Sequence, residues 1–145
     1  MVQMNPSHFP ARHPSRPLTL QIEGSAIDGI DSLFTELNRV FMASEDWQLG
    51  PSLDALDDLL HGGYGALAGH AAVTVIWRDI EHSRSALGQQ ATVDWLQAKQ
   101  QAPGLFDNRA ISRQLAAVQR GDGQTYFEIV MEIFASHRQI TLVPA

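Results

Sequence analysis

Three segments of the chain have the apolar patterns of β-strands. Residues 18–22 (LTLQI) alternate apolar and polar side chains, as in a half-buried strand. Residues 73–77 (VTVIW) are a continuous apolar run rich in β-branched side chains. This run predicts a strand buried on both faces, as in a parallel sheet surrounded by helices. Residues 140–143 (ITLV) predict a last strand.

The segments between these strands have helical spacing. Apolar side chains recur three and four positions apart from Ile30 onward, and Asp28 is the predicted N-cap of this helix. A second helix is predicted between Ser52, its N-cap, and Gly62, which ends it. Further helices are predicted at residues 79–87, 90–101, 107–119 and 125–137. Strands that alternate with helices predict an α/β fold with a three-stranded parallel β-sheet packed with helices.

The second predicted helix carries three aspartates on one side. Asp54, Asp57 and Asp58 span about 100° of the helical wheel, and four leucines occupy the opposite side. No lysine or arginine occurs between Arg39 and Arg78. A solvent-exposed helix face would explain this pattern. However, the like-charged pair Asp54–Asp58 costs roughly a few tenths of a kcal/mol in helix stability, so the charge also suggests a binding surface.

The chain as a whole is acidic, with a formal net charge of −6. Residues 1–17 contain four of the seven prolines, and we expect a flexible tail there and a single domain at 18–145. Because Arg12 and Arg16 lie in the tail, the domain holds 8 basic and 16 acidic residues, a charge of about −8. A basic docking arm is the alternative for the tail. The charge argues against nucleic acid as a partner and favours a basic protein.

The composition limits the compartment and the chemistry. The sequence has no cysteine, no apolar run long enough to span a membrane and no apolar leader, which predicts a cytoplasmic protein without membrane contact. Neither GxSxG nor GxGxxG occurs, and we expect no enzymatic activity and no cofactor. Among the histidines, only His82 beside Glu81 is placed near a carboxylate on a helix. We expect the histidines at surfaces or helix ends, and no metal site.

The second helix and its surroundings resemble the barstar family, the intracellular inhibitors of the secreted ribonuclease barnase. The pattern GxxLDALxDxL is present as GPSLDALDDLL at 50–60, and Gly62 follows it. The sequences IEG at 22–24, VIWRDIEHS at 75–83 and ITLV at 140–143 support the likeness.

The likeness covers about residues 18–87 and 124–143, and a helical insertion is expected at about 88–123, before the last helix. The resemblance implies a three-stranded parallel sheet with helices packed on it. It also implies a function: family members plug the active site of a ribonuclease with the second helix and the adjoining loop. Their acidic side chains replace the substrate phosphate opposite basic residues, as in immunity proteins that neutralise a toxin.

The resemblance also implies a set of partner-binding residues. Asp54 and Asp58 match the two inhibitory aspartates of the family, with Asp58 the deeper anchor, and Glu132 matches a contacting glutamate on the last helix. Gln48 stands where the family has a contacting tyrosine, and Asp57 where it has a tryptophan. Aromatic contacts are expected from two other loop residues, Trp47 and Tyr64.

Two other functions stay open at this stage. The chain could be an interaction module that keeps the barstar-like fold but binds a partner other than a ribonuclease through the insertion at 88–123. It could also be an enzyme, although the sequence offers no adequate catalytic constellation. Deleting the insertion would separate the first alternative from inhibition, and ligand-induced thermal stabilisation would favour the second.

Overall fold

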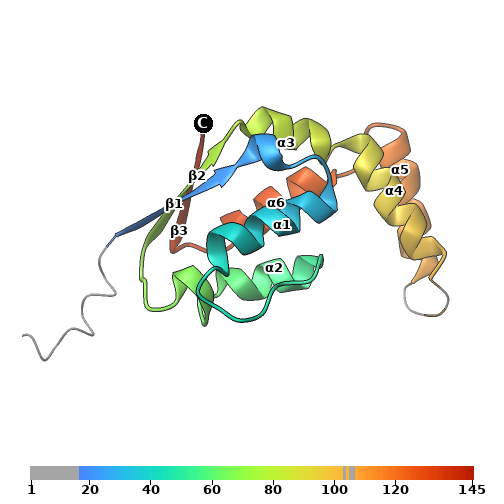
Figure 1. Ribbon diagram of the computed structural model, residues 1–145. Helices are drawn as coiled ribbons and strands as arrows, with labels where there is room; N and C mark the ends of the chain where they lie inside the picture. The colour runs from blue at the N-terminus through green and yellow to red at the C-terminus, as the bar shows by residue number, and fades with distance from the viewer. Residues whose placement is uncertain (1–16, 103, 105–106) are drawn as a thin grey trace, which may run out of the picture.

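The structure is a computed structural model of the chain and describes residues 17–102, 104 and 107–145. Within these residues the strands are β1 (Leu18–Glu23), β2 (Val73–Arg78) and β3 (Ile140–Pro144). The helices are α1 (Ile30–Phe41), α2 (Leu53–Leu60), α3 (Ile80–Ala86), α4 (Gln89–Gln100), α5 (Asn108–Gln119) and α6 (Tyr126–Ala135). Figure 1 shows this order, which the sequence predicted. The predicted tail at 1–17 lies outside the described residues except for Pro17.

The three strands form one parallel sheet in the order β1-β2-β3. Leu20 of β1 pairs with Val75 of β2, and Val75 pairs with Leu142 of β3. Parallel neighbours cannot be joined by a tight hairpin and need long crossover connections, which the intervening helices provide. The predicted three-stranded parallel sheet is therefore confirmed.

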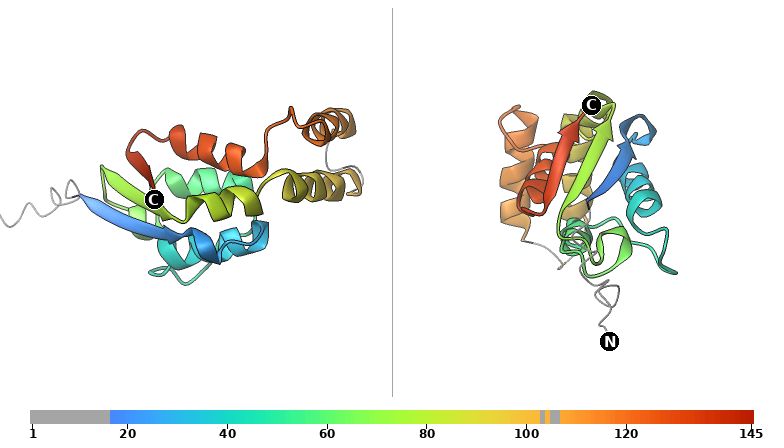
Figure 2. Two further views of the ribbon diagram at one scale, coloured as in Figure 1. Left: turned by 90° about the horizontal axis from the view of Figure 1, so that it is seen from above. Right: turned by 90° about the vertical axis from the view of Figure 1, so that its left-hand side faces the viewer.

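The sheet is covered by helices on one face only. Val73, Val75 and Trp77 of β2 are buried, whereas the alternate residues Thr74 and Ile76 are only half-buried. In the right view of Figure 2 the sheet lies in front of the helices, which all extend behind it. The prediction that β2 is buried on both faces is therefore wrong. The run is apolar throughout because β-branched residues favour strands and also occur at the positions of β2 that point to the open face of the sheet.

A buried hydrogen-bond chain joins β2 and α3 to Gly24, the residue that directly follows β1. The Trp77 indole Nε1–H donates to Ser83 Oγ at 2.9 Å, and the Ser83 hydroxyl donates to the Gly24 carbonyl at 3.1 Å. A side chain at Gly24 could not fit, because a Cβ there would lie 2.2 Å from the Arg78 carbonyl oxygen. Three of the residues on which the barstar resemblance depends thus have a structural role in this fold.

The start of α1 differs from the prediction. Gly29, not Asp28, is the N-cap, and the Ser32 hydroxyl oxygen accepts the Gly29 N–H at 3.0 Å. The Asp28 carboxylate instead lies 3.0 Å from His82 Nε2 of α3. A serine at the third helical position can therefore satisfy the first free N–H group, and Asp28 is left to contact a neighbouring helix.

Helices α4 and α5 form a hairpin that projects away from the sheet at one end of the molecule (Figures 1 and 2). The hairpin has a small apolar cluster of its own, formed by Leu96, Ile111, Leu115 and Val118. Trp95 packs against both this cluster and the main core. The hairpin is also attached through Thr92, whose hydroxyl oxygen accepts the Tyr126 N–H at 2.7 Å. The helices predicted within 88–123 are therefore confirmed.

Candidate binding surface

The acidic helix α2 forms as the sequence predicts. Ser52 Oγ accepts the Ala55 N–H at 3.2 Å, which caps the helix, and Gly62 adopts a positive φ of 83° beyond its end. The buried side chains of α2 are Leu56, Leu59 and Leu60. Asp54 and Asp58 are exposed, whereas Asp57 is half-buried. The three aspartates therefore do not share one environment.

Asp58 lies near Tyr64, an aromatic side chain of the loop after α2. Burial raises the pKa of Tyr64, and the negative charge of Asp58 raises it further. The Tyr64 ring packs against the Trp47 ring with centroids 4.9 Å apart, and Trp47 remains 45% exposed. The structure thus brings together three of the residues predicted to bind the partner. An exposed tryptophan packed on a tyrosine that lies near a carboxylate is typical of a protein-binding surface.

Hydrogen bonds hold the two loops in this arrangement. The side chain of Asn38 on α1 donates to the Leu49 carbonyl at 3.2 Å and accepts the Leu49 N–H at 2.8 Å. Glu45 Oε2 accepts the Gly65 N–H at 2.8 Å, which links the loop before α2 to the loop after it. Sequence reasoning did not single out Asn38 or Glu45. Their polar groups act on loop backbone, and no local spacing indicates such contacts.

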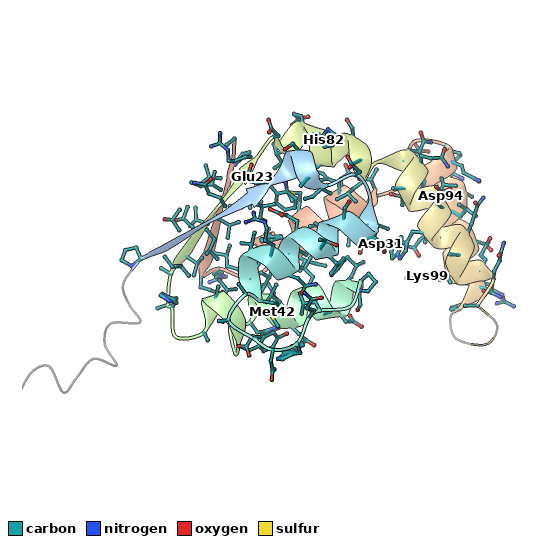
Figure 3. The ribbon with its side chains drawn as sticks, viewed as in Figure 1. Glu23, Asp31, Met42, His82, Asp94 and Lys99 are labelled. Carbon is teal, nitrogen blue, oxygen red and sulfur yellow. The ribbon has the colours of Figure 1, made fainter. Side chains whose placement is uncertain are left out.

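Asp54, at the other end of α2, faces the hairpin. It lines a cleft of about 470 Å³ together with Trp95, Lys99 and Tyr126. The Lys99 ammonium lies over the Trp95 ring, 4.1 Å from its centroid (Figure 3 labels Lys99 on α4). Burial lowers the pKa of Lys99, while the charge of Asp54 acts in the opposite direction. The hairpin therefore supplies a cation close to Asp54, which the sequence around α2 does not reveal.

Asp57 is directed away from the aromatic pair, toward the end of α6. Its Oδ1 lies 2.7 Å from Nε2 of His137, which is only 8% exposed. His61 Nδ1 lies 2.9 Å from the Asp57 carbonyl oxygen, and the two imidazole rings meet edge to face at 4.7 Å between centroids. The prediction that only His82 lies near a carboxylate on a helix is wrong, because the Asp57 carboxylate lies within 4.8 Å of a ring nitrogen of His61, which is four residues later at the end of α2. That spacing could have indicated the contact.

The remaining predicted residues, Gln48 and Glu132, are exposed. Gln48 is next to Trp47 in the loop before α2. Glu132 lies on α6, which packs beside α2, and its Oε2 accepts the Gln124 side-chain amide at 3.1 Å. Among the described residues the structure records no contact between Glu132 and the aspartates of α2. The predicted set therefore divides into a cluster around Asp58 and more separate residues at its edges.

Comparison with known proteins does not assign this chain to a family. No protein-family model matches the sequence, and no curated protein matches it significantly. In the part of the chain that the structure describes, none of the helices has both the length and the apolar character needed to cross a lipid bilayer.

Proposed function

We propose that this chain is a barstar-like inhibitor that binds a ribonuclease and blocks its active site with α2 and the loops on either side. The observation that carries the proposal is the position of Asp58. It is exposed, it lies beside Tyr64 with Trp47 next in line, and none of the described cations forms an ion pair with it. A carboxylate in this position is available to a basic partner.

The physical basis is mimicry of a phosphate. The active site of a ribonuclease presents arginine, lysine and histidine to the RNA backbone, and a carboxylate can accept charge-assisted hydrogen bonds from the same groups. Removing such a buried anchor from an interface costs at least about 2 kcal/mol and up to several kcal/mol, and the upper end of that range was set by an aspartate of the barstar family itself. Acidic loop residues would add long-range attraction that speeds association.

The surroundings of the aspartates assign them unequal roles. Lys99 lies close enough to Asp54 to influence it, so part of the Asp54 charge is compensated before a partner arrives. The carboxylate whose charge acts on Lys99 is that of Asp54, and none of the described cations forms an ion pair with Asp58. We therefore expect Asp58→Ala to weaken inhibition more than Asp54→Ala does. Replacing Lys99 by glutamine should speed association with a basic partner, because it removes a positive charge from the same surface.

The experiment is a titration of the protein into a barnase-type ribonuclease assay, next to Asp58→Ala and a control, Asp122→Ala. Asp122 is a suitable control because it is exposed on the turn after α5, and its partner there, Arg120, is also exposed. Asp107 would be a poor control because its carboxylate caps α5 through two backbone N–H groups. We expect stoichiometric inhibition that Asp58→Ala loses and Asp122→Ala retains, with association that slows as salt is added. Equal losses in both variants would refute the proposed surface.

The hairpin supports a second candidate, an interaction module with a partner other than a ribonuclease. The specific observation is that α4 and α5 have an apolar cluster separate from the main core. The ends of the insertion are adjacent, because the Phe127 N–H donates to the Leu87 carbonyl at 3.0 Å. A short linker can therefore replace residues 88–123. Inhibition that survives this deletion supports the first proposal, whereas binding to a partner that disappears with the hairpin supports the second.

A further inference from the structure

Three side chains at the junction of α2, α6 and β3 form a group with the composition of a metal site. Asp57, His61 and His137 each offer one ligand atom, and these atoms all lie within 4.8 Å of one another. Asp57 lies on α2 and His61, one turn later, is the C-cap of that helix, so their side chains project from the same side. His137 comes from the connection between α6 and β3. Two elements that are distant in sequence thus place three potential ligands around one point.

The fold builds this group independently of any ligand. The His137 N–H donates to the Phe134 carbonyl at 3.2 Å, which continues the last turn of α6. Two residues later, the Gln139 side-chain amide donates to the Leu60 carbonyl at 2.7 Å and ties the connection to the end of α2. Because His137 is only 8% exposed, packing restricts its imidazole to one region. Restricted ligands lose less entropy when they bind an ion.

The hydrogen bonds also orient the ligand atoms. His61 Nδ1 lies 2.9 Å from the Asp57 carbonyl oxygen, so the proton belongs on Nδ1 and the lone pair on Nε2. A backbone carbonyl that accepts from the second imidazole nitrogen is a common support of histidine ligands. His137 Nε2 and Asp57 Oδ1 lie 2.7 Å apart, and an ion between them would replace the shared proton. Ligands at 2.0–2.1 Å around a tetrahedral ion are separated by about 3.3 Å, which small side-chain rotations can reach.

We propose that Asp57, His61 and His137 bind a divalent transition-metal ion of the Zn²⁺ class, with the fourth coordination position open to water. Two imidazoles and one carboxylate suit Zn²⁺, whereas Ca²⁺ takes six to eight oxygen ligands. The fourth position is open because His61 is exposed and the Asp57 side chain is 46% exposed. The bound ion would join α2 to the start of β3. It would also place positive charge next to the acidic surface.

The test is a titration of the full chain with Zn²⁺ by calorimetry, together with the visible absorption of the Co²⁺-substituted protein, which is intense only for tetrahedral coordination. The main variant is His61→Ala, because His61 is exposed and its loss leaves the core intact. Asp57→Asn is a second variant that keeps the side-chain shape. His82→Ala is the matched control, because His82 is an exposed histidine that also contacts an aspartate but lies outside the group.

We expect one Zn²⁺ per chain, a Co²⁺ spectrum of tetrahedral intensity, and an affinity that His61→Ala lowers about tenfold or more while His82→Ala leaves it unchanged. The bound ion should also raise the melting temperature of the wild-type protein but not that of His61→Ala. The absence of saturable binding would overturn the proposal. So would binding that His61→Ala and Asp57→Asn leave unchanged, since the ion would then occupy other residues.

Discussion

Replacing Ser83 by alanine tests whether the hydrogen-bond chain between Trp77 and Gly24 stabilises the fold. Ser83 is fully buried, and its hydroxyl is both the acceptor for the Trp77 indole N–H and a donor to the Gly24 carbonyl. Alanine removes one oxygen atom and leaves the buried Trp77 N–H without this acceptor, whereas the Gly24 carbonyl keeps its bond from the Ile27 N–H at 3.1 Å. The gap left by one oxygen atom is smaller than a water molecule needs, so solvent cannot replace the lost contacts.

The magnitude follows from these two groups. Leaving the buried Trp77 N–H unsatisfied costs about 1–3 kcal/mol. The Gly24 carbonyl still accepts the Ile27 N–H, so the loss of its second bond costs only about 0.5–1.5 kcal/mol, and the two losses together come to roughly 1.5–4.5 kcal/mol. Alanine favours a helix more than serine does, which returns about 0.5 kcal/mol. The net loss in the free energy of unfolding should therefore be about 1–4 kcal/mol. This is a large fraction of the roughly 5–15 kcal/mol by which domains are usually stable.

The assay is equilibrium unfolding in urea, followed by the fluorescence of the three tryptophans and by circular dichroism. Ser85→Ala is the control, because Ser85 is exposed on the same helix and reports the change in helix propensity alone. We expect a lower midpoint for Ser83→Ala at an unchanged slope. If Ser83→Ala were no less stable than Ser85→Ala, the reasoning from buried hydrogen bonds would be wrong.

Two further changes test other buried polar groups. The Glu36 carboxylate, with a side chain only 5% exposed, accepts two bonds from Arg39. Although burial acts to raise its pKa, the bonds from Arg39 and from the backbone lower it below its ordinary value. Because the pKa of Glu36 is depressed in the folded state, the Glu36 carboxylate stabilises the fold at pH values above its unfolded-state pKa. That stabilisation is lost as the pH falls through the folded-state pKa. Glu36→Gln should therefore make the stability fall less steeply with pH in acid unfolding curves. Thr92→Val leaves the Tyr126 N–H unsatisfied and should cost about 1–3 kcal/mol in urea unfolding, and a loss below that of an exposed Thr35→Val control would contradict the assignment.

Local pattern was sufficient to predict the strands and helices of this fold. Alternation and helical spacing depend on which side chains face a core, and that information is present in each short segment. The prediction for β2 went wrong because an apolar run does not say whether the second face is covered. Ile76 is as apolar as a core residue, yet it is only half-buried on the open face of the sheet.

The candidate binding surface was harder to predict from the sequence than the fold. Asp58, Tyr64 and Trp47 come from one continuous stretch, and the structure places them together. In contrast, His137 reaches Asp57 across 80 positions of the chain, and Lys99 reaches Asp54 from a hairpin inserted between other elements. Such contacts depend on how α4 and α6 pack relative to α2. A pattern read along one helix contains no information on that packing.

These distant contacts change what the acidic helix can do. Three like charges on two turns repel one another, and in isolation all three would be equally exposed to a partner. In the folded chain Lys99 lies near Asp54 and His137 is bonded to Asp57, so two of the three carboxylates have a basic neighbour. Lys99 thus offsets part of the negative charge of α2 from another helix, and His137 holds the Asp57 carboxylate in a hydrogen bond. What remains is Asp58, which lies near Tyr64 and forms no ion pair with any cation in the described part of the chain. A single carboxylate of this kind gives a basic partner one defined point of attachment.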